Sequence, residues 1–454
     1  MLEFFLNLIN DLTLALISRM IPGTLKEQQT AMFKLATFKV DCTPPAGTVV
    51  GLNFSGGAEF IRDPLYLHGY IFSATGGRYL IASMDYCALL HSAYEQLQTA
   101  LAEGAGTAVE HTAVHCIHQH DAPLIDFEAA KYINPQAHLR FAWYRGIIDK
   151  CRHAAAAASE NFVEITETGF NEHRIHGYAS NRRMPDKDGR IQVRLSRCAE
   201  QALRDLPAGT IDPMLRTCAF KDCYGGIAAT LSFYATHPQV ANSGNKFSAD
   251  APGEAVRLLE HEIPDAIHGF FTGAGGNITA GKYTSADDLE GNILKFGKKL
   301  ADGISSNIKG MQWEPAGDLA WRKASFPFPA VPADRNKLGE MLQKDPASAA
   351  SAAALLGADD FNPSPEYVIN MLHTGNVRLI FLPGEPFVEY QLFIQSLLPD
   401  EFVAVAANCR DDFLYLPLAA SFNETGGYET GYFCRTTPEF EPRFKAAVTG
   451  LLGR

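Results

Sequence analysis

Short apolar runs that end in glycine, proline or histidine recur along the chain, and this pattern constrains the fold more than any other feature. Strand-like apolar runs span 33–44, 79–90, 107–118, 225–238, 266–276 and 376–385. Helix-like runs span 93–104, 252–263 and 292–308 between them. Strands that alternate with helices predict an α/β fold in which mixed β-sheets are flanked by helices.

Two segments fall outside this alternation. Residues 1–31 are apolar, but Glu3 and Asp11 interrupt the run, and neither a basic start nor an AxA cleavage site accompanies it. An amphipathic helix, or a chain start at Met32, explains this N-terminal extension better than a signal peptide or a membrane span, and its role is left open. The Ala- and Ser-rich stretch 344–361 predicts a surface helix or a lid.

Charge and cysteine usage limit the partners and the compartment. The 39 basic and 51 acidic residues give a net charge of −12, so nucleic acid is not an expected partner. The nine cysteines are scattered and none forms a CxxC pair, which indicates free, mostly buried thiols. Free thiols and the lack of a clear signal peptide favour the cytoplasm, although the compartment and the oligomeric state are left open.

Polar and ionisable residues cluster at the ends of the strand-like runs, where loops from separate strands of an α/β sheet converge on ligands. They are His118 and His120 in "HQHDAP", His237 in "ATHPQV", Asn277 and Thr279 in "GAGGNITAG", and Glu385 in "LPGE". Two or three imidazoles with one carboxylate are a common ligand set for catalytic zinc. An extended HxH segment would also place both imidazoles on one face.

Each of these short patterns also has an ordinary structural explanation. An HxH pair occurs by chance, "THP" is a common turn, and "PGE" is a common connection from strand to helix. The sequence lacks the motifs of several other enzyme classes. It contains no GxSxG of serine esterases, no GxxxxGK[ST] of P-loop proteins and no HExxH. Its "GAGTAV" and "GAGGNI" lack the third glycine of the dinucleotide-binding GxGxxG.

An ordered set of segments resembles the neutral/alkaline ceramidase family. The set runs from about residue 33 to about residue 428 and comprises "KVDCTPPAG", "RDPLY", "SMDYCAL", "HQHDAP", "NRRMPDKDG", "IDPML", "ATHPQV", "SADAPGEAVRLLE", "GAGGNITAG", "LPGE" and "GGYE". The resemblance implies a ceramidase-like fold with a single catalytic domain over 32–454 and no C-terminal immunoglobulin-like domain.

The resemblance also implies roles for individual residues. "HQHDAP" matches the family's HTHSGP, which carries a zinc-ligand role to His118 and a catalytic, substrate-facing role to His120. The family's next ligand histidine falls on His237, and the carboxylate of its PGE segment falls on Glu385. The implied cofactor is Zn²⁺.

The chain departs from the family at two positions of the site. Where the family has N-x-Y-x-x-Y, with the first tyrosine on the zinc, "RDDFLY" offers Asp412 at that position and Tyr415 three residues later. Tyr415 is the preferred fourth ligand and Asp412 the alternative. The family's SPN segment, whose serine meets the substrate amide, is replaced by "TAG", with Thr279 at the hydroxyl position.

The function implied is that of a zinc-dependent amidohydrolase that cleaves an N-acyl amide, such as a ceramide-like lipid of sphingolipid metabolism or a related small molecule, with a metal-activated water. His120 would move the proton, and Arg182 in "SNRRMP" would stabilise the oxyanion. Arg183 is expected in a surface salt bridge. Asp85 and Asp250 would orient the histidines or act as caps and turns. Two alternatives remain: a catalytically lapsed binding protein, and a hydrolase of a different amide or ester.

Overall fold

The computed structural model of the chain describes residues 33–48, 57–133 and 141–454. Met32–Arg454 form one compact unit. The N-terminal extension at 1–31 lies outside the described residues. Within the described ranges, no helix combines the length and apolar character that a membrane crossing requires.

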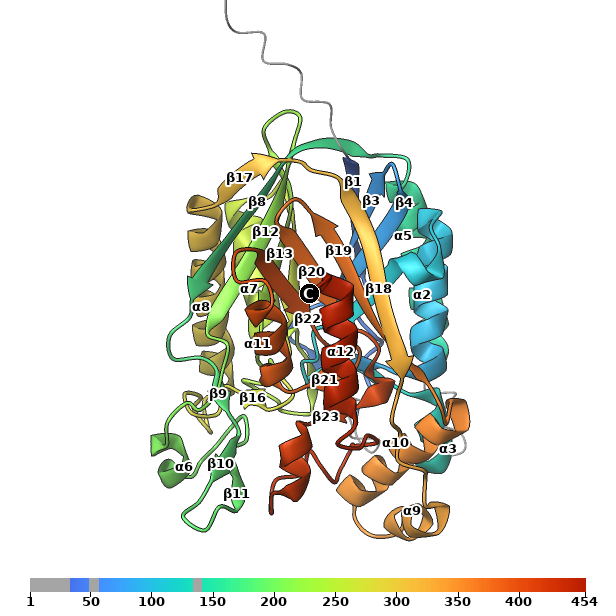
Figure 1. Cartoon of the computed structure of the whole chain (residues 1–454), viewed down its shortest axis with the longest axis vertical. Helices are drawn as coiled ribbons and strands as arrows, with labels where there is room; N and C mark the ends of the chain where they lie inside the picture. The colour runs from blue at the N-terminus through green and yellow to red at the C-terminus, as the bar shows by residue number, and fades with distance from the viewer. Residues whose placement is uncertain (1–32, 49–56, 134–140) are drawn as a thin grey trace, which may run out of the picture. The chain divides into compact units, whose positions relative to one another are not determined.

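A nine-stranded mixed sheet forms the larger half of this unit (Figure 1). Its strands follow the order β15-β13-β12-β8-β1-β3-β4-β6, with β17 paired to β8. Most neighbours are antiparallel, but β13 and β15, and β4 and β6, run parallel. The strands are β1 (Phe33–Asp41), β3 (Tyr66–Ala74), β4 (Gly77–Met84), β6 (Thr112–Cys116), β8 (Val163–Arg174), β12 (Met214–Asp222), β13 (Ile227–Tyr234), β15 (Ile267–Thr272) and β17 (Gln312–Pro315).

A second sheet of four strands packs against one face of the first. It follows the order β18 (Leu319–Pro327), β19 (Glu366–Thr374), β20 (Val377–Phe381) and β22 (Phe402–Ala406). Side chains alternate across the large sheet: Tyr70 and Phe72 belong to the core between the sheets, whereas Ile71 belongs to the core beneath the helices. Because successive side chains of a strand point to opposite faces, neighbouring residues of one strand belong to different cores.

Helices cover the outer faces of both sheets and complete four layers. Four helices cover the face of the large sheet that points away from the small sheet: α2 (His91–Ala105) and α5 (Ala142–Ala158) lie over one half of it, and α7 (Asp250–Glu262) and α8 (Leu289–Lys309) over the other (Figure 1). Two further helices, α11 (Val388–Ser396) and α12 (Phe440–Leu452), cover the small sheet with one apolar core. Mixed sheets flanked by helices confirm the predicted fold class, and every strand-like and helix-like run contains the predicted element.

The helix predicted at 344–361 exists, and it packs one face against the rest of the chain. It is α10 (Pro346–Phe361), and more than half of its residues are buried. A Cβ added to Gly357 would lie 2.6 Å from the backbone nitrogen of Ala129 in α3 (Phe127–Ile133). The small residues of α10 thus allow close helix packing, which a sequence rich in alanine cannot distinguish from an exposed helix.

Short elements carry the remaining loops. Two-stranded ladders join β2 (Phe60–Ile61) with β14 (Lys246–Phe247), β5 (Ala88–Leu89) with β7 (Leu124–Ile125), β9 (Ser180–Asn181) with β16 (Ile278–Thr279), β10 (Arg183–Pro185) with β11 (Ile191–Val193), and β21 (Glu385–Pro386) with β23 (Tyr415–Leu416). The short helices are α6 (Gln201–Asp205) and α9 (Arg335–Met341). These ladders connect loops that are distant in sequence, and two of them contain candidate site residues.

Candidate metal centre

Backbone contacts bring the carboxyl ends of three strands together. Thr272, the last residue of β15, donates from its hydroxyl to the carbonyl of Ile117 beyond β6, at 2.6 Å. Its carbonyl accepts a hydrogen bond from the backbone of Ala407, beyond β22, at 2.8 Å. The loops that follow these strands therefore converge, as the sequence pattern predicts, and the candidate site lies among them.

His118 and His237 present the same ring nitrogen to the site. The Nδ1 atom of His118 lies 2.9 Å from the carbonyl oxygen of Cys87, and Nδ1 of His237 lies 2.7 Å from the carbonyl oxygen of Gly275. Because a carbonyl oxygen can only accept, each Nδ1 carries the proton and each Nε2 keeps its lone pair. This backbone support fixes the tautomer that a metal ligand needs.

One oxygen of Glu385 faces both free nitrogens. Its Oε2 lies 3.4 Å from Nε2 of His118 and 3.1 Å from Nε2 of His237. Ligand atoms at zinc distances of about 2.0–2.1 Å on a tetrahedron stand about 3.3 Å apart, so both spacings match tetrahedral edges. The ligand atoms of all three residues lie within 4.8 Å of one another, and all three residues are buried.

The charges of this cluster suit a cation. Burial raises the pKa of Glu385, but His118 and His237 more than offset this and hold the pKa well below its ordinary value, so the carboxylate is ionised. Burial lowers the pKa of His118, yet Glu385 outweighs burial and leaves the pKa raised. In His237, burial and the charge of Arg182 lower the pKa to about 4. Two imidazoles therefore share one buried negative charge.

His120 lies beside these residues, outside the His118–His237–Glu385 group but in a second group of possible metal ligands with His118 and Cys87. Its ring centroid is 5.0 Å from that of His118 and 6.1 Å from that of His237. Its buried Nε2 has no hydrogen-bond partner among the residues that the structure describes. Burial, with His118 and His237, lowers the pKa of His120 well below its usual value, so the ring is neutral near pH 7.

The rings of His118 and His120 lie close together, but not because the segment is extended, as predicted. His118 is not extended but has a φ of 65°, in the left-handed region that non-glycine residues rarely adopt. Its backbone nitrogen donates to the carbonyl of Tyr86 at 3.0 Å, which holds this conformation. The HxH spacing therefore predicted correctly that His118 and His120 are neighbours, but the extended backbone on which that prediction relied is not present.

Arg182 is fully buried and paired with Glu429. Its Nε donates to Oε1 of Glu429 at 2.9 Å, and its Nη2 donates to the carbonyl of Gly276. The guanidinium stacks over the rings of Tyr415 and Tyr428, at 5.1 and 4.9 Å from their centroids. Its Nη1 has no hydrogen bond to the other described residues, and its charge acts on His237, as the pKa of that residue shows.

Arg183 is also buried, which corrects the prediction of a surface salt bridge. It donates from Nη1 to Oε2 of Glu429 and from Nη2 to Oε2 of Glu424, the latter at 2.6 Å. The completely buried carboxylate of Glu429 thus lies between two guanidinium groups. The sequence analysis assigned no role to Glu429, although it lies in the family-like segment "GGYE". The available signal was its position: an acidic residue outside any predicted exposed helix can be buried and paired.

The two candidates for the fourth ligand face different surroundings. Tyr415 is the direct partner of Glu385 in the β21–β23 ladder, so its side chain lies on the same face, next to the cluster. Asp412 instead accepts a hydrogen bond from Nε of Arg410 at 2.8 Å, and its Oδ2 lies 3.5 Å from Nδ1 of His91. The structure therefore directs Asp412 away from the cluster.

Thr279 does not offer its hydroxyl to the cluster. The hydroxyl donates to the carbonyl of Arg194 at 3.3 Å and accepts from the backbone nitrogen of Gly281 at 3.1 Å. Asp250 accepts hydrogen bonds from the backbone nitrogens of Val240 and Ala241, just after His237, and so holds that loop. The side chains of Thr279 and Asp250 therefore hold loop backbone in place and form no hydrogen bond with any of the three clustered residues.

Asp85 and Asp411 are the remaining buried carboxylates near the site. Asp85 accepts from the backbone nitrogen of Tyr66 at 2.8 Å and so joins the end of β4 to the start of β3, and its carboxylate has no hydrogen bond to a histidine among the described residues. Asp411, which sequence reasoning missed, accepts from Nδ2 of Asn408 at 3.0 Å. Burial raises the pKa of Asp411 to about 7 despite the opposing influence of His118.

Comparison with solved structures connects this geometry to a known fold. A ceramidase complexed with C2 superposes with a TM-score of 0.70 and 15% identity, over 93% of this chain and 75% of that chain. The neutral ceramidase from Pseudomonas aeruginosa superposes with a TM-score of 0.68 and 15% identity, over 93% and 74%. The chain has the neutral ceramidase fold.

Sequence comparison alone does not reach this ceramidase fold. No protein-family model matches the chain, and no curated protein sequence matches it. At 15% identity the likeness establishes the fold, while the chemistry must be argued from the residues of this chain.

Proposed function

We propose that the chain is a zinc-dependent hydrolase that cleaves an N-acyl amide. The observation that carries the proposal is the placement of the Nε2 atoms of His237 and His118 at 3.1 and 3.4 Å from one carboxylate oxygen of Glu385. These spacings match a tetrahedral zinc shell, and the backbone carbonyls behind both rings hold them in the required tautomer. His118, His237 and Glu385 would hold the ion, with Tyr415 as the proposed fourth protein ligand.

Zinc, when bound, would act as a Lewis acid and lower the pKa of a water molecule from about 15.7 towards about 7. The neutral His120 accepts the proton of the attacking water and returns it to the leaving amine. Its place beside both ligand rings supports this role, because a general base must reach the water without occupying the metal.

Arg182 supplies the positive charge for the oxyanion that forms at the carbonyl. Two of its nitrogens are held by Glu429 and Gly276, so the guanidinium is fixed before the reaction, and Nη1 is the donor left for a substrate. Preorganised donors of this kind contribute more than mobile ones because they need no reorganisation in the transition state. Thr279, the residue at the family's serine position, would need to exchange its hydrogen bond to Arg194 to meet a substrate amide.

The proposed substrate class is a lipid-like N-acyl amide, with ceramide as the first candidate. The support is the fold shared with two ceramidases, together with an amide-hydrolysing residue set. The departures at Asp412 and Thr279 support a second candidate, a hydrolase of a different amide or an ester. A binding protein without activity would keep the ligands but lack turnover.

Elemental analysis and a hydrolysis assay test the proposal together. The purified chain is expected to hold about one zinc per molecule and to release fatty acid from N-acyl sphingosine. His118→Ala and His237→Ala should lose both the zinc and the activity, whereas His173→Ala, which changes an exposed histidine of β8, should keep both. Full zinc in both ligand variants would refute the site. Zinc without hydrolysis of any N-acyl amide or ester would favour the binding protein.

A further inference from the structure

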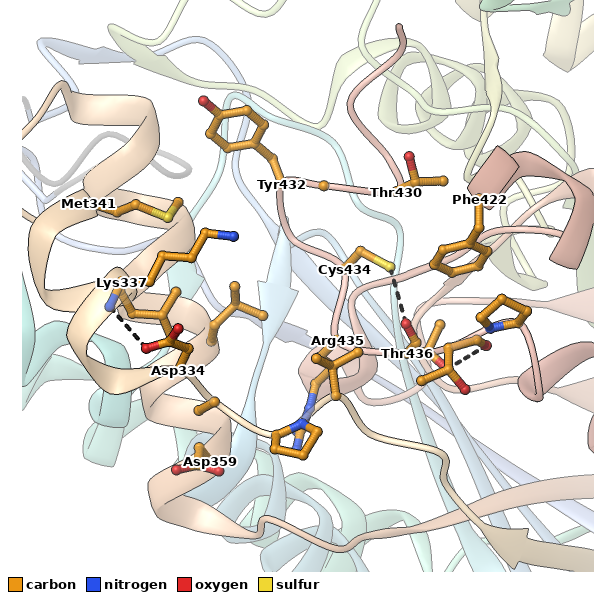
Figure 2. Close-up of a pocket in the computed structure, with 18 residues that line it drawn as sticks. Asp334, Lys337, Met341, Asp359, Phe422, Thr430, Tyr432, Cys434, Arg435 and Thr436 are labelled. Atoms are coloured by element: carbon orange, nitrogen blue, oxygen red, sulfur yellow. Dashed lines mark hydrogen bonds between the residues drawn. The ribbon is translucent and has the colours of Figure 1, made fainter. Parts of the chain in front are cut away.

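A second cavity lies between α9, α10 and the segment 430–438 (Figure 2). Its volume is about 560 Å³, within the usual range for small-molecule sites. It shares no lining residue with the His118–His237–Glu385 cluster. The cavity is therefore separate from the candidate metal centre, and the proposed hydrolase chemistry gives it no role.

The walls of this cavity are mainly apolar. They include Val331, Leu338, Met341, Leu355, Phe422 and Pro438. Leu338 is buried and Met341 partly buried, both on α9, while Phe422 comes from the short helix η3 (Ala419–Asn423) on the opposite side. Such a surface excludes a fully polar ligand and suits a flexible apolar chain, because removing apolar surface from water is favourable.

Two cations of the lining lack carboxylate partners. Lys337 is an exposed residue at the rim and forms no ion pair with another described residue, and Figure 2 shows its ammonium reaching from α9 into the cavity. Arg435 is almost fully buried and donates only to the carbonyls of Asp412 and Asn362, at 3.3 and 3.0 Å. A buried guanidinium without a carboxylate is unusual, since buried charges are normally paired.

Neither acid of the lining forms an ion pair with Lys337 or Arg435. Asp334 caps α9 by accepting from the backbone nitrogen of Lys337 at 3.1 Å. Asp359 is paired with Arg335 at 2.7 Å, and Arg335 itself does not line the cavity. Lys337 therefore keeps ammonium donors that no described carboxylate takes, next to an apolar wall, while the two acids limit the net charge of the lining.

We propose that this cavity binds an amphipathic carboxylate, that is, an apolar chain that ends in a single carboxylate. The chain would lie along Leu338, Met341 and Phe422, and the carboxylate would face Lys337 with Arg435 behind it. A monoanion fits better than a phosphate dianion, because Asp334 and Asp359 repel a second negative charge and Arg435 already uses donors on backbone carbonyls. This inference is independent of the proposed hydrolase activity.

Calorimetric titration of the full chain with dodecanoate tests the cavity. Native protein is expected to bind dodecanoate at least about tenfold more tightly than dodecanol, as one charge-assisted contact allows. Lys337→Gln should remove this difference, whereas the matched control Lys344→Gln, an exposed lysine outside the cavity, should retain it. Met341→Trp should abolish binding of both ligands by filling the apolar part.

His237→Ala separates this site from the metal centre. Dodecanoate binding should persist in that variant, because His237 does not line the cavity. Loss of binding in His237→Ala, with normal binding in Lys337→Gln and Met341→Trp, would overturn the proposal and move the ligand to the metal centre. Equal affinities of native protein for dodecanoate and dodecanol would overturn the assignment of an anion.

Discussion

The carboxylate of Glu429 accepts a hydrogen bond from Nε of Arg182 at 2.9 Å, across 247 positions of sequence. Both side chains are almost completely inaccessible to solvent. Glu429 also accepts from Arg183, so two guanidinium groups share one carboxylate at the edge of the candidate site. The orientation of Arg182 towards His237 and Tyr415 therefore depends on a residue that has no direct part in the proposed chemistry.

Glu429→Gln should lower turnover by about 10²-fold while leaving zinc content normal. The amide cannot hold two guanidinium groups, so Arg182 loses its fixed orientation and its charge is left unpaired. Elemental analysis and kcat measure the two effects separately. Glu424→Gln is the matched control, because Glu424 is partly exposed and contacts Arg183 but not Arg182. Native turnover in Glu429→Gln with normal zinc would show that Arg182 is held by other contacts.

His120→Ala should retain zinc but lose about 10² to 10⁴ in turnover, the usual contribution of a general acid–base group. Because burial, with His118 and His237, lowers the pKa of His120 well below its ordinary value, the ring stays neutral from pH 6 to 8. The loss of activity should therefore be similar across that range. Zinc loss from this variant would instead make His120 a ligand.

The sequence predicts six of the strands because their burial pattern is local. Leu80, Ile81 and Ala82 alternate between two cores, and this segment is already visible as an apolar run at 79–90. The residues of the candidate metal centre come together for a related reason: His118, His237 and Glu385 all follow apolar strands, and the ceramidase-like segments contain them. These signals depend on residues that are close together in the chain.

Partner choice between distant segments could not be predicted. Arg182 and Arg183 are neighbours with the same chemistry, and only the tertiary structure assigns Gly276 to one and Glu424 to the other. Thr279 occupies the expected position in the loop, yet its hydroxyl is held by Arg194. The left-handed backbone at His118 depends on its contact with Tyr86, which local sequence does not encode.

Asp85→Asn should stabilise the protein increasingly as the pH rises. Burial raises the pKa of Asp85 to about 7 in the folded state, although the hydrogen bond from Tyr66 opposes this. A raised folded-state pKa means that stability is fully present below the unfolded pKa near 4 and is lost as the pH rises through about 7. The asparagine variant does not ionise and avoids this loss.

Urea unfolding in the presence of a chelator measures this effect. The difference in unfolding free energy between Asp85→Asn and the native chain should grow by roughly 2–3 kcal/mol between pH 5 and pH 8. Asp318→Asn, which changes an exposed carboxylate, controls for the general effect of removing a charge. A difference that stays constant with pH would mean that Asp85 is ionised in the folded protein at pH 5.

The fourth ligand can be identified by comparing Tyr415→Phe with Asp412→Asn. Tyr415 is the ladder partner of Glu385, so removal of its hydroxyl should weaken zinc binding by about tenfold, in the range found for groups that support or complete metal sites. Asp412 faces Arg410 and His91, so its amide variant should bind zinc within about twofold of native affinity.

Stability distinguishes the two residues as well. Asp412→Asn breaks a partly buried ion pair with Arg410 and should lower the unfolding free energy by about 1–3 kcal/mol in the metal-free protein, whereas Tyr415→Phe keeps the ring and its packing. Competition with a zinc chelator gives the affinities, and urea unfolding gives the stabilities. Weaker zinc binding in Asp412→Asn alone would exchange the roles of the two residues. Native affinity in both variants would mean that His118, His237 and Glu385 hold the ion alone, with the fourth position free for water and substrate.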